Sequence, residues 1–175
     1  MNKFTRRTVI AAACAAAAMT FAPMSFAQQA PEKKDVTIAV GGKSLYYYLP
    51  LSIAEQLGYF KDEGLNVKIV DFQGGSRSLQ AVVGGSADVV SGAFEHTISM
   101  QAKKQPMTAF VLQGRAPQLA LVVSNKTMKD YKQLSDLKGK KVGVTAPGSS
   151  SQMVANFILK KGGLGPKDVA FIGVG

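Results

Sequence analysis

The segment Gly148-Ser149-Ser150 stands directly before a run that is expected to be helical, and its residue types suit the binding of an anion. Backbone N–H groups and serine hydroxyls at the start of a helix can donate hydrogen bonds to an oxyanion, and the partial positive charge of that helix end attracts it. No charged side chain is needed. A serine at such a position can also cap the helix through its side chain. We therefore predict that Ser149 or Ser150 contacts a ligand and that one of the serines caps the helix.

Two loops in the first half of the chain carry further candidates. Ser44, Tyr46 and Tyr47 follow the first expected strand, and a tyrosine offers an apolar face and one hydroxyl to a small polar ligand. Because three adjacent tyrosines cannot all point the same way, at least one of them is expected to pack instead. In the second loop, Gly75 and Ser76 allow a close approach of the backbone, whose N–H groups can meet an anion. A plain turn is the alternative there.

A third loop contains Gly92, Ala93, Glu95 and His96. Glu95 can accept hydrogen bonds from an amine or a ring N–H, which favours a pyrimidine-like or cationic ligand over an anion. The alternative is a solvated glutamate that the helix dipole favours at the start of a helix. His96 is the sole histidine of the chain, and metal catalysis ordinarily needs more ligands than one, so we place it on a helix surface. The sequence indicates no catalytic residue, no metal site and no cofactor.

The elements that must position these loops alternate between strand and helix, which predicts an α/β fold with a mostly parallel sheet. Residues 36–40 are the β-branched apolar run of a strand covered on both faces, and residues 65–72 form the next strand. A helix between them begins at Pro50 and ends at Gly58. Its buried face is expected to consist of Pro50, Ile53, Ala54 and Leu57. In such a sheet, ligands bind beyond the carboxyl ends of the strands, where most of the candidate loops lie.

The rest of the chain continues the alternation. Strands are expected at residues 87–90, 107–113 and 169–172, and a turn followed by a strand at residues 134–144. Residues 118–123 are interpreted as a hinge that crosses into another domain. Two helices are expected to bury apolar faces, the first with Leu79, Val82 and Val83 and the second with Met153, Val154, Phe157 and Ile158. A further helix covers residues 94–102.

The N-terminus predicts export. Residues 1–27 contain three cations and no acid, an apolar stretch at residues 9–22, and a small-x-small cleavage pattern ending at Ala27. Residues 5–10 are similar to a twin-arginine motif, and an ordinary charged region for the Sec route is the alternative. Cys14, the only cysteine, lies in this segment, so the processed chain would contain none. We predict a periplasmic protein that leaves the cytoplasm by the Sec or the twin-arginine route.

The charge of the processed chain is basic. Removing the three cations of residues 1–27 from the 21 Lys and Arg leaves 18 against 11 acids, a net charge of +7. A positive field favours anionic ligands. The alternative is that the lysines are merely solvated, since many of them lie around turns and helix ends. No part of the sequence is typical of a nucleic-acid surface with interleaved aromatic residues.

Several blocks in order resemble the periplasmic solute-binding proteins of the nitrate, sulfonate and taurine type, a group that includes proteins binding thiamine-precursor pyrimidines. The blocks are residues 53–70, Gly85-Ser86-Ala87-Asp88-Val89, residues 134–144 and residues 148–151. The resemblance implies a periplasmic-binding-protein-like fold of two α/β lobes around a cleft, with the second lobe incomplete. The corresponding division is residues 1–27 as signal peptide, 28–114 as the first part of lobe one, and 115–175 as the hinge and the start of lobe two.

The resemblance also implies a function. It is the capture of a small anionic organic or oxyanion solute, of the sulfonate, taurine or nitrate class, and its delivery to the membrane permease of an ABC importer. An alternative is pyrimidine-precursor binding, or an enzyme similar to the thiamine-pyrimidine synthases. Those enzymes resemble cytosolic proteins with a cysteine-rich stretch, so the export signal and the absence of cysteine after Cys14 favour a binding protein. An exported sensor without a transport role is a third interpretation.

Overall fold

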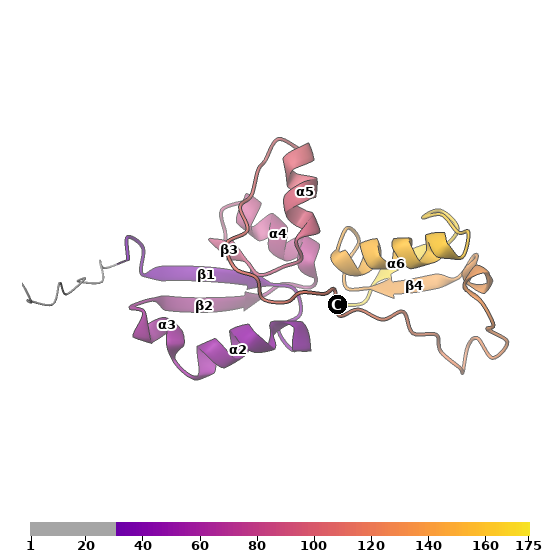
Figure 1. The fold of residues 1–175 in the computed structure, drawn as a ribbon, viewed down its shortest axis with the longest axis horizontal. Coiled ribbons are helices and arrows are strands. Elements are labelled where there is room, and N and C mark those ends of the chain that lie inside the picture. Colours follow the sequence, from indigo (N-terminus) through magenta and orange to yellow (C-terminus); the bar gives the residue numbers. More distant parts are fainter. Residues whose placement is uncertain (1–30) are drawn as a thin grey trace, which may run out of the picture. The chain divides into compact units, whose positions relative to one another are not determined.

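The computed structural model describes residues 31–175, so the predicted signal peptide lies outside the described residues. The strands of the described part form two separate sheets, and all strand pairs are parallel (Figure 1). We call them the first sheet, from strands β1 to β3, and the second sheet, from β4 and β5. Between residues 31 and 175 no helix is both long enough and apolar enough to cross a membrane.

The first sheet has the order β2-β1-β3, with β1 (Asp35–Val40) in the centre, β2 (Asn66–Asp71) on one side and β3 (Val89–Val90) on the other. The expected strands at residues 36–40, 65–72 and 87–90 are therefore confirmed. Ala39 and Val40 are completely buried, as the apolar run of a central strand requires. Parallel pairing brings the carboxyl ends of all three strands to one edge.

Helices cover both faces of the first sheet. Figure 1 shows the 3-10 helix η1 (Tyr46–Tyr48), α2 (Leu49–Gln56) and α3 (Tyr59–Asp62) on one side, and α4 (Gly75–Val83) and α5 (Glu95–Ala102) on the other. Side chains of β1 alternate accordingly: Ile38 and Val40 cluster with Tyr48, whereas Ala39 clusters with Ala81 of α4. Gly58 ends α2 with a φ of 81°, as the sequence predicts.

The second sheet pairs β4 (Lys141–Val144) with β5 (Ala170–Gly173). Helix α6 (Ser150–Lys161) and the 3-10 helix η2 (Leu134–Leu137) pack on it. Its core consists of apolar side chains that are at most 8% exposed, listed here: Leu137, Val142, Ala155, Leu159, Leu164 and Val169. The strands and the helix predicted for this region are confirmed.

The predicted buried faces of the helices are partly wrong. In α2, Ile53 and Leu57 are 43% and 60% exposed, and Leu51 packs on the core instead. In α6, Met153 and Phe157 are 45% and 62% exposed. In α4, Leu79 is buried, Val82 packs on the core from a partly buried position and Val83 is 47% exposed.

The rotation of α2 and α6 is set at their N-terminal ends. The hydroxyl of Ser151 accepts a hydrogen bond from the Thr145 N–H at the end of β4, which turns Ser151, Ala155 and Leu159 toward the sheet at i, i+4 and i+8. Tyr48, buried at the start of α2, accepts a hydrogen bond from the Gly41 N–H through its hydroxyl at 3.1 Å, which ties the start of this helix to the end of β1. Apolar periodicity alone is compatible with two adjacent faces of each helix being buried, and these contacts determine which face packs on the sheet.

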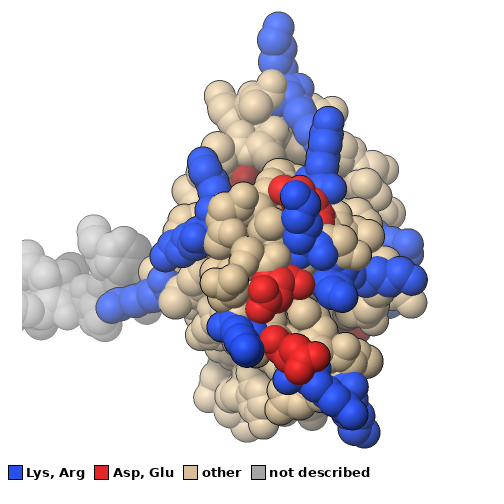
Figure 2. Space-filling model, turned by 90° about the vertical axis from the view of Figure 1, so that its right-hand side faces the viewer, with Lys and Arg blue, Asp and Glu red and all other residues tan. Residues whose placement is uncertain are grey.

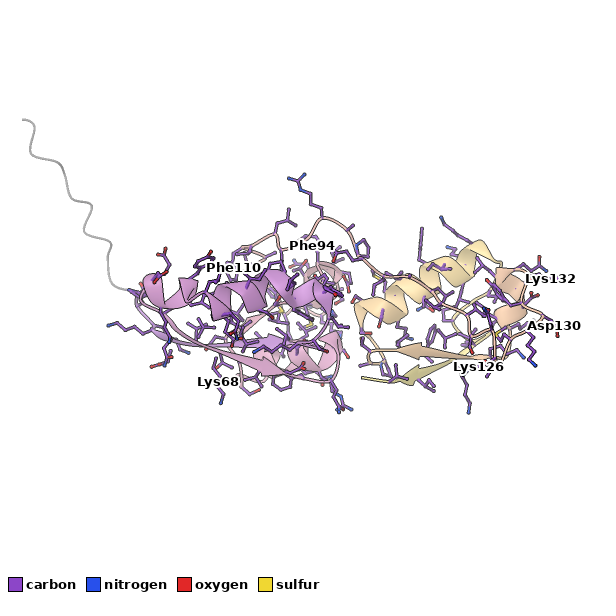
Figure 3. The ribbon with its side chains drawn as sticks, turned by 90° about the horizontal axis from the view of Figure 1, so that it is seen from below. Lys68, Phe94, Phe110, Lys126, Asp130 and Lys132 are labelled. Atoms are coloured by element: carbon purple, nitrogen blue, oxygen red, sulfur yellow. The ribbon has the colours of Figure 1, made fainter. Side chains whose placement is uncertain are left out.

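The strand expected at residues 107–113 is not formed, because this segment pairs with no strand within residues 31–175, and residues 118–123 likewise form no ladder. A cavity of about 510 Å³ lies between β3, α2 and this segment, and Val89, Leu51 and Met107 are among its lining residues. Phe110, Val111 and Leu112 are 72–74% exposed. Figure 3 shows Phe110 and Phe94 beside the elements of the first sheet. A strand needs a partner for its backbone groups, and local apolar character does not supply one.

Candidate functional site

The loop after β1 is fixed against the start of α4. A Cβ at Gly41 would stand 2.4 Å from the backbone of Gly74 and Gly75, so the two backbones pass each other too closely for any side chain at position 41. The Asp71 carboxylate at the end of β2 accepts hydrogen bonds from the N–H groups of Gly42 at 2.7 Å and Lys43 at 3.0 Å. Asp71 is thus used in building the loop.

The N-termini of α4 and α6 lie next to each other. The Ser76 hydroxyl donates a hydrogen bond to the carbonyl of Pro147 at 3.0 Å. A Cβ at Gly74 would stand 2.7 Å from Cβ of Ala146, and one at Gly148 would stand 3.8 Å from Cβ of Ser76. Two loops that are about 70 residues apart in the sequence therefore meet at the start of two helices.

Both helix ends are left without a side-chain cap. The N–H groups of Ser76, Ser150 and Ser151 find no hydrogen-bond acceptor within residues 31–175. Free N–H groups at a helix start carry the positive end of the helix dipole. The arrangement therefore offers converging donors to a negatively charged group, whereas the sequence offers each of the two loops only as a separate candidate.

The serines of the loop before α6 have roles that differ from the expectation. Ser149 is 3% exposed, and its hydroxyl lies 3.1 Å from that of Thr145 and 2.7 Å from that of Ser151. The start of α6 has no side-chain cap, so the expectation that one of the serines caps this helix is wrong. Gln152 instead accepts the N–H of Gly148 at 2.7 Å. Ser149 is thus part of the packing of the loop, whereas Ser150, at the first position of α6, is half-buried.

The structure separates the three adjacent tyrosines. Tyr48 is 4% exposed and packs, as expected of at least one of them, whereas Tyr46 is 88% exposed. Tyr47 is held in place: its hydroxyl donates to the carbonyl of Gly92 at 3.2 Å, and its own carbonyl accepts from the side-chain amide of Gln113 at 2.6 Å. Ser44, like Tyr46, is exposed, and the structure brings neither to the other candidates.

His96 is buried, 7% exposed, so its predicted place on a helix surface is wrong. Its Nε2 has no hydrogen-bond partner and lies 3.3 Å from where a Cβ of Gly75 would stand, at the first residue of α4. Burial lowers the pKa of His96, and the charge of Glu95 opposes that shift. Burial also raises the pKa of Tyr47, and Glu95 adds to it. His96 is the second residue of α5, and its position directly after the loop that follows β3 is the sequence signal that favours a place near that loop.

Part of the candidate set lies together beside the N-terminus of α4, namely Tyr47, Gly75, Gly92, Glu95 and His96. Ala93 is half-buried and lines the 510 Å³ cavity together with Gly92. Two cations lie close in sequence to these loops: Lys43 is paired with Glu55 at 2.7 Å, and Arg77 donates a hydrogen bond to the side chain of Gln73 at 3.3 Å. Within residues 31–175, no three His, Cys, Asp or Glu side chains are grouped as a metal ion would require.

The lysines of the second half do not converge on the site. They are exposed, and Figure 2 shows basic side chains spread over a whole face of the molecule with few acids among them. In Figure 3, Lys126 and Lys132 lie with Asp130 beside the elements of the second sheet. The lysines predicted to be solvated, namely Lys138, Lys140, Lys141, Lys160, Lys161 and Lys167, are exposed.

Known structures share this fold. A structure of a protein from Bordetella bronchiseptica RB50 superposes with a TM-score of 0.80 and 67% identity, over 82% of this chain and 45% of that chain. The alkanesulfonate-binding protein SsuA from Xanthomonas axonopodis pv. citri, bound to MOPS, gives a TM-score of 0.56 at 21% identity, over 83% of this chain and 49% of that chain. The fold is thus the α/β fold of periplasmic binding proteins.

Sequence comparison gives relatives of two kinds. A family model described as "NMT1/THI5 like" matches residues 46–175. The chain is 27% identical to a 4-amino-5-hydroxymethyl-2-methylpyrimidine phosphate synthase of Schizosaccharomyces pombe over 80% of this chain and 39% of that protein. It is 26% identical to the "Putative binding protein YtlA" of Bacillus subtilis over 98% of this chain and 51% of that protein. The chain spans about half the length of these relatives or less.

Proposed function

The chain belongs to the NMT1/THI5-like family, and from this premise we propose that it captures a small anionic solute and delivers it to a membrane importer. The solute is an organic anion or an oxyanion of the sulfonate, taurine or nitrate class, and the partner is the permease of an ABC importer. Similarity to a binding protein of Bacillus subtilis supports the binding role. The choice of an anion rests on the geometry.

The observation that carries the proposal is the meeting of two uncapped helix N-termini, joined by the hydrogen bond from Ser76 to the Pro147 carbonyl. A hydrogen bond to a charged group contributes about 1.5–3 kcal/mol. Hydrogen bonds from the three free N–H groups would therefore contribute a summed free energy of the order of ~8 kcal/mol, which corresponds to micromolar affinity. No cationic side chain is needed, and Lys43 is already paired with Glu55.

The other parts of the proposal concern the location and the organisation of the protein. Residues 1–27 act as a signal peptide for the Sec or the twin-arginine route, and the protein works in the periplasm. Residues 28–114 and 115–175 belong to two lobes, so a solute held by both α4 and α6 closes one lobe on the other. The exposed lysines raise the local concentration of anions without contacting the bound solute.

A second candidate function is the binding of a pyrimidine precursor. The buried oxygen of Glu95 supports it, because it can accept a hydrogen bond from an amine or a ring N–H. Similarity to a pyrimidine phosphate synthase points to the same ligand chemistry. An enzymatic role finds less support, since the sequence after Cys14 contains no cysteine for a thiolate nucleophile or a cysteine-held metal.

The test is calorimetric titration of the purified protein with ethanesulfonate, nitrate and a 4-aminopyrimidine, with tetramethylammonium as a cationic control. Mass spectrometry of the protein as isolated identifies any solute that co-purifies. We expect at least one anion to bind at micromolar concentration and the cation to show no heat. Binding of the pyrimidine alone would favour the second candidate, and turnover of any of these compounds would favour an enzyme.

A further inference from the structure

Glu95 differs from the other acids around the first sheet. The Asp71 carboxylate accepts hydrogen bonds from two backbone N–H groups. Asp88 accepts a hydrogen bond from the Thr37 N–H at 2.8 Å and forms an ion pair with Lys33. Glu55 is paired with Lys43. Glu95, in contrast, receives no hydrogen bond from any residue between 31 and 175, and its Oε1 is buried. A buried acceptor without a donor is rare in folded proteins, and binding of a further group is one explanation for it.

His96 provides an independent observation at the same place. It is 7% exposed, and its unpartnered Nε2 lies 3.3 Å from the position that a Cβ of Gly75 would take, directly at the N-terminus of α4. Its Cδ2 lies 3.6 Å from the corresponding position at Gly92. The Oε1 atom of Glu95 and the Nε2 atom of His96, on adjacent residues at the start of α5, are thus buried without partners within residues 31–175, beside the helix end that is proposed to hold an anion.

A helix-start glutamate that merely favours the helix dipole would keep its oxygens in water. Burial of Oε1 is unfavourable for that role, because an ionised carboxylate only accepts hydrogen bonds and loses its water without replacement. A carboxylate beside the anion site also repels a plain oxyanion. Both difficulties disappear if the bound solute brings an N–H group of its own to Glu95.

We propose that Glu95 is a specificity-determining residue, which accepts a hydrogen bond from an amino or ring N–H group on the same small anion that the N-termini of α4 and α6 hold. The inference rests on the proposed function and narrows it. The solute is an anion with a hydrogen-bond donor a few bonds away, preferred over the matching anion without the donor. His96 lines the same subsite and excludes water from it.

The test compares ligands that differ only in the donor. Titrations measure 3-aminopropanoate against propanoate, and 2-aminoethanesulfonate against ethanesulfonate. For the unchanged protein we expect the aminated member of at least one pair to bind tenfold more tightly or better. In Glu95→Gln the shape is kept and the charge is lost, so the preference is expected to fall below threefold while the plain anion binds equally well or better. Glu55→Gln, a paired carboxylate on α2, serves as the matched control and keeps the preference.

The possible results separate this inference from the proposed function. If both members of each pair bind equally to the unchanged protein, the inference is wrong and anion capture stands. The same conclusion follows if Glu95→Gln folds and keeps the full preference. If nitrate binds and no anion of either pair does, the inference is wrong and anion capture stands. If neither nitrate nor any anion of the two pairs binds, both proposals fail. Should Glu95→Gln not fold, the comparison of ligand pairs on the unchanged protein still decides, and Glu95→Asp, which shortens the carboxylate by one methylene, is expected to weaken only the aminated ligands.

Discussion

Replacing Ser150 by proline removes one backbone N–H from the proposed anion site with little change to helix α6. Ser150 is the first residue of this helix, a position that proline favours because its fixed φ suits the helix and its missing N–H makes no intrahelical bond. The preceding residue, Ser149, has φ −83° and ψ 167°, an extended conformation that a following proline accepts. Folding should therefore be preserved.

The expected loss of affinity follows from one hydrogen bond to a charged group. Such a bond contributes about 1.5–3 kcal/mol, so an anion that binds the unchanged protein should bind Ser150→Pro roughly 10- to 150-fold more weakly. Calorimetric titration measures the affinity, and denaturant unfolding checks that stability is unchanged within about 1 kcal/mol. Ser150→Ala keeps the N–H and removes only the hydroxyl, so it should stay within about threefold of the unchanged protein. Equal anion affinity in a folded Ser150→Pro would refute the role of the α6 N-terminus.

Other predictions concern the packing that holds the site. Gly41→Ala should lower the free energy of unfolding by about 1–3 kcal/mol, measured by denaturant unfolding, since its Cβ would stand 2.4 Å from the backbone of Gly74 and Gly75; an unchanged midpoint would contradict this close approach. Leu159→Ala, at a completely buried position, should lower the free energy of unfolding by about 2–5 kcal/mol. Phe157→Ala, on the exposed face of the same helix, should lower it by less than ~1 kcal/mol. The reverse order would show that α6 is rotated. Because burial lowers the pKa of His96, the unfolded chain binds a proton more readily than the folded one. The free energy of unfolding should therefore fall as the pH drops below the ordinary histidine pKa of 6.5. His96→Asn should show a flatter dependence of this free energy on pH between about pH 7 and pH 5. Identical slopes for both proteins would rule out the burial of this histidine.

The strands that form in residues 31–175, and the turn that ends α2, could be predicted because their causes are local. The β-branched run of β1 suits a strand covered on both faces, and it lies in the centre of the first sheet. Gly58 ends α2 in the left-handed conformation that glycine adopts most readily. The place of most candidate loops, beyond the carboxyl ends of parallel strands, follows from the alternation of strands and helices.

The role of each side chain within those loops could not be predicted in the same way. Ser149 and Ser150 have the same residue type at adjacent positions, and only the hydroxyl contacts with Thr145 and Ser151 bury the first and leave the second. Tyr46 and Tyr48 differ likewise, one 88% and the other 4% exposed. Adjacent residues on a helix or turn point in different directions, and the neighbouring elements decide which of them is covered.

The amino-acid sequence by itself determined the class of the fold, the order of its elements and the family, since these depend on periodicity, glycine positions and ordered blocks of residues. Only the tertiary structure decided that His96 is buried, that residues 107–113 form no ladder, and that the starts of α4 and α6 touch through Ser76 and Pro147. The physical reason is the range of the interactions. Backbone conformation is set by neighbours in the chain, whereas burial, strand pairing and the convergence of donors depend on residues that are far away in the sequence and close in space.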